Sequence, residues 1–534
     1  MARTPLFRVI RRSFRIARAS LHSPVTPDEF IEQKLERSVR PWTRREILAA
    51  AGIGAAAAFT RCASSPSGSA KKKVDEPVLI FGAGSAGLTA AYRLRTAGVP
   101  VRVFEASERT GGRILSLRDF FPDGQFCELG GELIDTNHES IRALATELGL
   151  ELDDLESDDP ALARELFHFG GKRRKDAEVV AAFRPVAAKV EAALATLGED
   201  VTYRDTGGGE ALDNQSIEQW LSSAGVTGWF KDLLDVGYTT EYGLPIGEQS
   251  ALNFLWMIEP TAPPFKIYGD SDERYRIRGG NDLLMSVLTN QVASSLQNGA
   301  LLESVRLAPD GRILCSVASK TEGNIELSAR HVILAIPFTT LRDVRIDVEL
   351  SPAKRKAIAE LGYGTNAKLM AGFSKRIWRE GAKSNGSVLT DKPFQLTWET
   401  SRLQKGASGI LTNFTGGAAG MKMGETRPER QAAELAKSLD GIFPGASAAR
   451  GGKQAGFHWP SYRWTRGSYS CYKPGQWTAF RGAEIERAGG LHFAGEHCSL
   501  DFQGFMEGGV STGEAAAAEI LADLGIARPK ERAA

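Results

Sequence analysis

Three glycines with a fixed spacing follow an apolar stretch of the chain, in the run Gly82-Ala83-Gly84-Ser85-Ala86-Gly87. In a turn of this kind the first glycine permits the tight bend, the second lets the backbone approach a pyrophosphate, and the third lets a helix pack closely. Glu105, 18 residues past Gly87, is placed to take ribose hydroxyls. We predict that a dinucleotide is bound by Gly82, Gly84, Ser85, Ala86, Gly87 and Glu105.

The elements around this turn have the order that such a site needs. Residues 78–81 are an apolar strand, an alanine- and leucine-rich helix follows the glycines, and residues 101–105 form a second strand that ends in the acid. The helix N-terminus would offer unpaired N–H groups to the phosphates. A glycine pattern alone also fits an ordinary loop, and it is the flanking strands and Glu105 that favour a dinucleotide site.

A second glycine pair, flanked by two arginines, comes directly after the acid in Arg109-Thr110-Gly111-Gly112-Arg113. Its backbone N–H groups and its two cations suit a diphosphate, although an arginine-rich surface turn is the alternative. A nicotinamide enzyme does not need this segment. The residues resemble the FAD-binding signature of the flavin amine oxidase family, which includes monoamine oxidases, polyamine oxidases and L-amino-acid oxidases. The resemblance implies noncovalent FAD held in part by Arg109, Gly112 and Arg113.

The far end of the chain resembles the C-terminal signature of the same family. It contains Leu491-His492-Phe493-Ala494-Gly495-Glu496 and, further on, Gln503-Gly504-Phe505-Met506-Glu507-Gly508-Gly509-Val510 before an alanine-rich helix. In that family a strand returns to the flavin here and a helix N-terminus points at its pyrophosphate and ribitol. The resemblance thus adds as cofactor-binding residues Gly130, Gly131, Glu132, Val305 beside the adenine, Gly495, Glu496, Met506 and Glu507.

Lys368 lies ten residues before Trp378, a spacing that resembles the family's lysine that holds a water near flavin N5. A cation at that position would favour the reduced, anionic flavin and place water for the reaction with oxygen. The alternative is a solvated lysine on a strand.

Three aromatic residues resemble those that monoamine oxidases present to the flavin face. They are Trp459, Tyr469 and Phe505, the last standing where those enzymes place a second tyrosine. Two facing rings leave a slot for a neutral amine, although aromatic core packing is the alternative reading. Ser468 falls where some monoamine oxidases carry the cysteine bonded to flavin, and Cys471 is three residues out of register, so we expect noncovalent FAD.

The substrate is the least defined part of the prediction. Some L-amino-acid oxidases place an arginine after the segment that corresponds to Leu129-Gly130-Gly131, whereas this chain has Glu132, which would repel a carboxylate. Glu132 would attract a distal ammonium or cap a turn near the flavin. We predict an amine rather than an amino acid. An arginine from elsewhere, such as Arg463 or Arg466, keeps the amino acid open, and monoamine, diamine and polyamine are not distinguished.

The resemblance implies an activity. We predict FAD-dependent oxidative deamination of an amine to an imine and then an aldehyde, with molecular oxygen reduced to hydrogen peroxide. An L-amino-acid oxidase is one alternative. A non-catalytic, exported flavin-binding protein is the other, although a carrier has no need of an amine slot.

The composition of the 534 residues is that of a globular protein, with 42% hydrophobic and 25% charged residues. A formal charge of +1 gives no general reason to expect nucleic acid as a partner. The five cysteines are too few for a disulfide framework, and no cysteine pair or histidine cluster has metal-ligand spacing. We therefore predict no metal. The sequence does not indicate the oligomeric state.

The N-terminal segment indicates export. A strongly basic head leads to the twin arginines Arg44 and Arg45 and then to an uncharged, alanine-rich run. This resembles a bacterial twin-arginine signal. The resemblance implies the twin-arginine export machinery as a partner and a periplasmic or otherwise exported location. Residues 47–60 are too short to span a bilayer as a normal helix. A disordered basic arm before an ordinary helix is the alternative, and Cys62 gives no clear cleavage site because Arg61 precedes it.

The fold class that follows is α/β, with an FAD-binding Rossmann-type domain like that of glutathione reductase and a discontinuous, mixed α/β substrate domain. Helices are expected over residues 143–153, 176–197 and, with breaks, 216–256, and a hairpin at 309–311. The predicted boundaries are: export signal and linker 1–73; FAD-binding domain 74–142, 275–350 and 462–527; substrate domain 143–274 and 351–461; tail 528–534.

Overall fold

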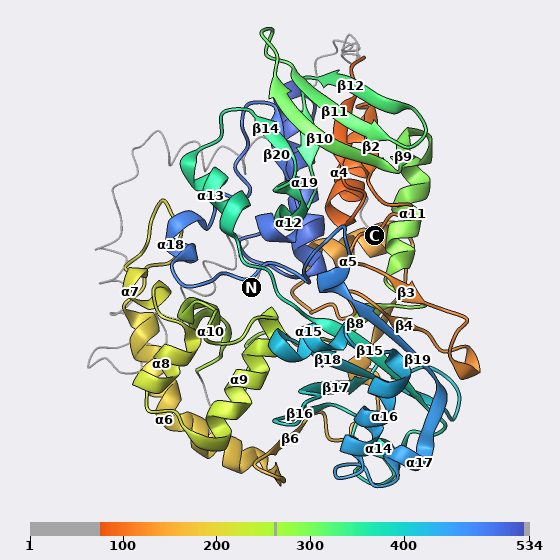
Figure 1. Cartoon of the computed structure of the whole chain (residues 1–534), viewed down its shortest axis with the longest axis vertical. Coiled ribbons are helices and arrows are strands. Elements are labelled where there is room, and N and C mark those ends of the chain that lie inside the picture. Colours follow the sequence, from red (N-terminus) through yellow and green to blue (C-terminus); the bar gives the residue numbers. More distant parts are fainter. Residues whose placement is uncertain (1–74, 261–263, 528–534) are drawn as a thin grey trace, which may run out of the picture. The chain divides into compact units, whose positions relative to one another are not determined.

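The computed structural model describes residues 75–260 and 264–527, which belong to one compact unit (Figure 1). The twin arginines, Cys62 and the apolar run after Arg45 lie outside the described residues, so the predicted export signal stays a prediction. No helix in the described part combines the length and the apolar character needed to cross a bilayer.

A five-stranded parallel sheet carries the glycine turn. Its strand order is β20 (Leu491–Phe493), β13 (Val332–Leu334), β1 (Val78–Phe81), β2 (Val101–Glu105) and β9 (Leu296–Asn298). Every residue of β1, β13 and β20 is buried, as expected of a parallel sheet covered on both faces. Helix α4 (Ser85–Thr96) follows β1 directly. The predicted order of strand, glycine turn, helix and strand is therefore confirmed.

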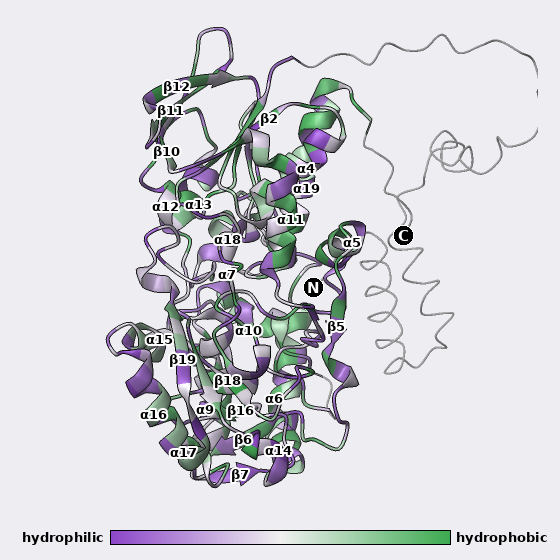
Figure 2. Cartoon of the chain, turned by 90° about the vertical axis from the view of Figure 1, so that its right-hand side faces the viewer, coloured by the Kyte–Doolittle hydropathy of each residue, from purple (hydrophilic) through white to green (hydrophobic). Residues whose placement is uncertain are grey.

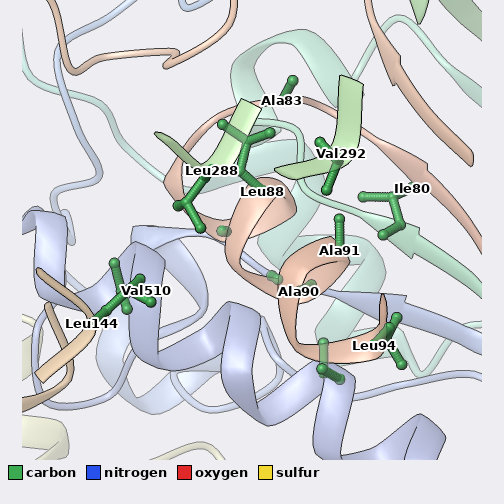
Figure 3. Close-up of a cluster of buried hydrophobic side chains, with 14 of the residues drawn as sticks. Ile80, Ala83, Leu88, Ala90, Ala91, Leu94, Leu144, Leu288, Val292 and Val510 are labelled. Carbon is green, nitrogen blue, oxygen red and sulfur yellow. The ribbon is translucent and has the colours of Figure 1, made fainter. Parts of the chain in front are cut away.

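Three helices form the core that supports this sheet. Side chains of α4, α11 (Asp282–Val292) and α19 (Met506–Leu524) meet in one cluster, which Figure 3 shows with Leu88, Leu288 and Val510. Helices α4 and α19 approach each other through glycine, since a Cβ on Gly513 would lie 2.3 Å from the carbonyl oxygen of Ala86. The alanine-rich C-terminal segment thus packs on the first helix of the cofactor domain.

A smaller sheet is attached to the cofactor domain. Strands β10 (Ala300–Leu307), β11 (Ile313–Ser319) and β12 (Gly323–Ala329) are antiparallel, and β14 (Arg345–Asp347) runs parallel to β10. The turn between β10 and β11 falls at the predicted hairpin, where Gly311 has a φ of +81°.

The second domain is built around a seven-stranded sheet. Its order is β19 (Arg450–His458), β15 (Ala367–Phe373), β18 (Gly409–Thr415), β17 (Leu396–Glu399), β16 (Val388–Thr390), β6 (Leu166–Phe169) and β7 (Lys172–Arg174). Strands β6 and β7 come from an earlier segment of the chain than the other five, so the domain is discontinuous. Figures 1 and 2 both place this sheet below the five-stranded one.

Helices from both segments complete this domain. They are α6 (Asp176–Ala195), α7 (Glu210–Asp213), α8 (Ile217–Ser223), α9 (Gly228–Tyr242), α10 (Ala251–Met257), α14 (Ile377–Glu380), α15 (Gly417–Met423), α16 (Pro428–Leu439) and α17 (Ala446–Ala449). The expected helices over 176–197 and 216–256 are present, the second in three pieces. The mixed α/β fold with a discontinuous second domain is confirmed.

The helix expected over residues 143–153 is placed wrongly. Helix α5 is Glu139–Glu147, and Gly149 follows with a φ of +73°. Leu152–Asp154 is strand β5, which pairs with β8 (Tyr275–Ile277). The glycine ends the helix and the chain turns into an extended segment, a signal that alanine and leucine periodicity does not carry.

The remaining elements are short. They are β3 (Ser116–Leu117), β4 (Cys127–Glu128), α12 (Phe338–Leu341), α13 (Pro352–Glu360), α18 (Gln476–Phe480) and the single turns Pro122–Gly124, Leu155–Ser157, Ala293–Ser295, Trp459–Ser461 and Glu496–Cys498. The four cysteines in the described part are buried and form no disulfide with one another.

Candidate active site

A cavity of about 610 Å³ is lined by residues of both domains, from Phe81 at the end of β1 to Lys368, Trp398 and Phe414 on the seven-stranded sheet. All the predicted site residues line this cavity except Gly87, Val305 and Glu507. Segments more than 400 residues apart in the sequence therefore meet around one space.

The glycine turn is shaped by close backbone contacts. Gly82 has a φ of +102°, and a Cβ on it would lie 2.3 Å from the carbonyl oxygen of Ala335. A Cβ on Gly87 would lie 1.9 Å from the carbonyl oxygen of Gly82, which explains why Gly87 packs the turn instead of lining the cavity. Gly84 caps α4 without a side-chain hydrogen bond, so the first N–H groups of the helix are left for a ligand.

Glu105 ends β2 at the cavity wall. Its two carboxylate oxygens accept hydrogen bonds from the backbone N–H groups of Ala83 at 2.8 Å and Ser107 at 2.9 Å. These bonds fix the carboxylate beside the glycine turn. Each oxygen keeps a second lone pair for a ribose hydroxyl.

The two arginines of the second glycine segment are held by the protein itself. Arg109 donates to the carbonyl oxygens of Thr110 at 3.1 Å and Gly112 at 2.6 Å. Arg113 forms a 2.7 Å ion pair with Glu496 and donates to the carbonyl oxygen of Ser468 at 2.9 Å. The arginines thus fasten the cavity wall together in addition to giving it positive charge.

Glu496 is the acidic residue of the ion pair with Arg113. It accepts hydrogen bonds from the Ser470 hydroxyl at 2.7 Å and the Gly504 N–H at 2.9 Å. Burial would raise its pKa, but the charge of Arg113 and these hydrogen bonds outweigh burial and lower the pKa. Glu496 is therefore ionised and joins the two C-terminal segments to the arginine.

Two predicted cofactor contacts lie elsewhere, which corrects their placement. Val305 is fully buried in β10, and the cavity is lined instead by residues 300–303 at the start of that strand. The Glu507 carboxylate accepts the backbone N–H groups of Ser140 at 2.9 Å and Ile141 at 2.8 Å, so it caps the N-terminus of α5. Both residues point to neighbours within the protein rather than to the cavity.

The glycine pair that precedes Glu132 allows close packing. A Cβ on Gly130 would lie 2.0 Å from the carbonyl oxygen of Arg113, and one on Gly131 would lie 2.8 Å from the sulfur of Met506. Gly495 also lines the cavity, with a φ of +146°. The glycine turn, the unpaired helix N-terminus and the fixed acid at the end of β2 together fit the phosphates and ribose of FAD.

Lys368 stands on β15 and is 5% exposed. Its ammonium donates to Glu132 at 2.7 Å, to the carbonyl oxygen of Gly130 at 2.9 Å and to that of Glu128 at 3.2 Å. It also lies 5.2 Å from the ring centre of Trp398. The lysine lines the cavity, as the water-holding role requires, but its three N–H groups already have partners in the protein.

Glu132 is the acidic residue of the ion pair with Lys368. It is buried, and it also accepts hydrogen bonds from Trp398 at 2.9 Å and from Thr400. Burial would raise its pKa, but the charge of Lys368 and the three donors outweigh burial and lower the pKa. Because Glu132 is neutralised by Lys368, it is not available to attract the ammonium of a substrate.

The three predicted aromatic residues line the cavity with different supports. Trp459 donates to the carbonyl oxygen of Leu129 at 2.9 Å and packs on Phe457. Tyr469 donates to the carbonyl oxygen of Glu241 at 2.6 Å, and burial raises its pKa well above the usual range. Phe505 packs against the ring of His138. Each ring is held by a separate contact, which leaves its cavity face available.

Two acidic residues of the cavity wall were not predicted. Glu241 lies at the end of α9 and Glu273 in the loop before β8, where its φ is +48°. Burial and the charge of Glu273 raise the pKa of Glu241 to about 8, and burial and the charge of Asp135 raise that of Glu273 to about 7. No sequence motif marks either residue, since both come from segments that show only helical or loop character. Trp398 in β17 and Phe414 in β18 were also not predicted, because no motif marks them.

Comparison with known proteins shows the family of the chain. Residues 85–521 match the family described as flavin containing amine oxidoreductase. An L-amino acid dehydrogenase of Synechocystis is 25% identical over 468 residues, covering 83% of this chain and 94% of that protein. A flavin-containing amine oxidase of Danio rerio is 23% identical over 486 residues, covering 84% and 86%. A solved cyclohexylamine oxidase from Brevibacterium oxydans matches with a TM-score of 0.74 and 22% identity, over 84% of this chain and 100% of that one.

Proposed function

The chain belongs to the family of flavin-containing amine oxidoreductases and oxidises amines with FAD, and from this premise we propose that its substrate is a diamine or polyamine. Such a substrate presents one neutral nitrogen for oxidation and a second, cationic nitrogen at a distance. The observation that carries the proposal is the pair Glu241 and Glu273.

These two carboxylates lie at the cavity wall without a partner. Among the described residues, no side-chain hydrogen bond or ion pair reaches either of them. Glu273 is exposed and Glu241 half-buried, yet enclosure by protein atoms raises the pKa of both. Their accessible surface therefore borders the cavity itself. An enclosed, unpaired carboxylate is costly, and a bound ammonium relieves that cost.

Three of the five lysine and arginine residues that line the cavity are in the opposite situation, and Arg109 is bonded to backbone carbonyl oxygens. Arg113 and Lys368 are paired with Glu496 and Glu132, and Arg466 forms a 2.6 Å ion pair with Asp343. Arg402 acts on the charge of Glu273, but no ion pair joins the two in the described part of the chain. The wall thus offers unpaired negative charge to a ligand, which favours a cationic substrate group over a carboxylate.

The protein's own residues then bind and orient the substrate. Glu241 and Glu273 hold the distal ammonium, while Tyr469 and Phe505 line the path of the reacting carbon. When bound, FAD supplies the redox chemistry by accepting two electrons and a hydrogen from the carbon next to the neutral nitrogen. Holding that carbon within about 3–3.5 Å of its acceptor is the protein's contribution. We propose oxygen as the final acceptor, with hydrogen peroxide as product.

A matched pair of substrates tests the proposal. 1,4-Diaminobutane and butylamine differ only in the second nitrogen, and we expect kcat/KM to favour the diamine about 10- to 100-fold, the value of a charged hydrogen bond. Glu241→Gln and Glu273→Gln should lower kcat/KM for the diamine and leave butylamine unchanged. Glu147→Gln, on the exposed end of α5, is the control. Equal rates for both amines in all variants would contradict the proposal.

An L-amino acid is the second candidate, favoured by the relative named as an L-amino acid dehydrogenase. Arg463 is the cavity-lining arginine to test, since it is exposed and packs on Trp464 instead of on an acid. A panel of L-amino acids, with and without Arg463→Ala, separates the two candidates. Peroxide detection under air, beside reduction of an artificial dye, identifies the electron acceptor.

We further propose that the chain is exported through the twin-arginine route. The support is the sequence alone, namely Arg44 and Arg45 before an uncharged apolar run. A Lys-Lys replacement should trap flavin-loaded enzyme in the cytoplasm. Normal export of that variant would show that another signal is used.

A further inference from the structure

Two histidines and an aspartate meet at the edge of the five-stranded sheet, away from the cavity. His331 comes directly before β13, His492 lies in the edge strand β20, and Asp523 is in the last turn of α19. One nitrogen or oxygen of each lies within 4.8 Å of those of the other two. The amine oxidation described above uses none of these residues.

The inner histidine is oriented by a carboxylate. His492 is 0% exposed, and its Nδ1 lies 2.8 Å from an oxygen of Glu519. A carboxylate at Nδ1 fixes the proton on that nitrogen, so the lone pair of Nε2 points away from Glu519. It points at His331, whose Nδ1 lies 3.4 Å from it. This arrangement of carboxylate, histidine and open nitrogen is the one found around metal-binding imidazoles.

The separation of the two nitrogens is long for a hydrogen bond and fits a shared ligand. A hydrogen bond from a ring N–H is usually about 2.9–3.0 Å long. Two nitrogens bound to one tetrahedral Zn²⁺, with bonds of about 2.0–2.1 Å, are about 3.3–3.4 Å apart. The observed 3.4 Å matches the second case.

Asp523 supplies the third ligand group. Its Oδ2 forms a 2.5 Å ion pair with Arg487, which leaves Oδ1 for a metal. The residue is exposed and His331 is half-buried, so the space between them is open to solvent. Arg330 and Arg312 stand at the rim, and both form ion pairs with the single carboxylate of Glu76, which offsets one of the two positive charges.

We propose that His331, His492 and Asp523 form a binding site for Zn²⁺, with water as the fourth ligand. Nitrogen and carboxylate ligands in a tetrahedral arrangement are those that zinc prefers. The bound ion would join β13, the edge strand β20 and the C-terminal turn of α19. It would thereby hold the C-terminal part of the cofactor domain, which comes last along the chain, against the sheet. This revises the expectation of no metal, which rested on spacing along the chain.

Calorimetric titration of ZnCl₂ into the FAD-loaded full chain, without a histidine tag and after EDTA treatment and dialysis, tests the site. We expect about one Zn²⁺ per chain and a Tm increase of roughly 3 °C at saturating metal. His331→Ala and Asp523→Ala should weaken binding at least tenfold, and Glu519→Gln about tenfold through the orientation of His492. His168→Ala, in β6 of the other sheet, is the control.

The outcomes are distinct. Loss of binding in His331→Ala and Asp523→Ala, with retained flavin absorbance and with binding intact in His168→Ala, would establish the site. If the wild-type chain takes up no zinc at micromolar concentration, or if His331→Ala binds as tightly as the control, the proposal is wrong. Asp523 is exposed, so its variant keeps the test valid even if His331→Ala fails to fold.

Discussion

The cofactor end of the cavity and its substrate end are built from different kinds of residues. At the cofactor end, backbone N–H groups and glycines dominate, and the charged side chains are already bound, Glu105 to two N–H groups and Arg113 to Glu496. At the substrate end the wall consists of side chains from separate strands and loops. Glu241 and Glu273 lie there without a partner.

This contrast indicates how each end recognises its ligand. At the cofactor end the charged side chains are held by the protein itself, so they offer a fixed arrangement to the ligand. The substrate end keeps two carboxyl groups without a side-chain partner among the described residues, and a bound cation can satisfy them. Variants at the first end should therefore affect occupancy and stability, whereas variants at the second should affect rates and selectivity.

The largest effect is expected from Arg113→Ala. Removal of the guanidinium takes a cation from the cavity and leaves Glu496 buried without its ion pair, a loss of about 3–5 kcal/mol. The purified variant should be depleted of FAD, as measured by its ratio of flavin to protein absorbance. Arg430→Ala, which breaks a surface ion pair with Glu434 away from the cavity, is the control. Full flavin occupancy of the Arg113 variant at low free FAD would refute the role of the arginine.

Lys368→Met should come next, because it leaves Glu132 charged and buried without its cation. We expect a loss of unfolding free energy on the order of 3–5 kcal/mol, measured by denaturant titration. The double variant Lys368→Met/Glu132→Gln removes both charges and should recover most of that loss. If the lysine places water, the reduced flavin of the double variant should react more slowly with oxygen. Reduction of the flavin by amine should be less affected. A double variant as unstable as the single one would contradict the pairing.

Tyr469→Ala and Phe505→Ala should act on rate alone. Removal of either ring lets the substrate carbon shift, and a displacement of about 1 Å costs about 100-fold in rate. Stopped-flow measurement should find slow reduction by amine and unchanged reoxidation by oxygen. Tyr469→Phe, which keeps the ring and loses the hydrogen bonds to the carbonyl oxygens of Glu241 and Thr240, is the mild control. Equal effects on both half-reactions would indicate that these rings only pack in the protein core and do not orient the substrate.

The smallest effect is expected from pH. Burial raises the pKa of Glu241 to about 8 and that of Glu273 to about 7, so Glu273 ionises around pH 7 and Glu241 around pH 8. The kcat/KM ratio of 1,4-diaminobutane to butylamine should therefore rise with pH, by at most about tenfold per pH unit for each carboxyl. The ratio cancels the ionisation common to both amines. A ratio that is flat in the wild type would contradict the role of the acids.

The sequence predicts the cofactor end well and the substrate end poorly, for a physical reason. A strand, a turn, a helix and an acid lie within one short segment, so their spacing along the chain is also their spacing in space. Lys368 and Glu132 are 236 residues apart in the sequence, and nothing in the sequence around either residue indicates that the two form an ion pair. Val305 and Glu507 were placed by resemblance, and local packing turns them away from the cavity. His331 and His492 are 161 residues apart, beyond any spacing rule for metal ligands.

The packing of α4 on α19 sets a time order for assembly. Arg93 of α4 and Glu514 of α19 are 421 residues apart, yet they share a hydrogen-bonded ion pair. At a synthesis rate of about 5–20 residues per second, α19 is made some tens of seconds after α4. The first helix of the cofactor domain lacks its packing partner during that time. Such distant contacts also make folding slow. Stable FAD insertion consequently belongs after translation, and a ribosome-bound chain that ends before β20 should remain colourless.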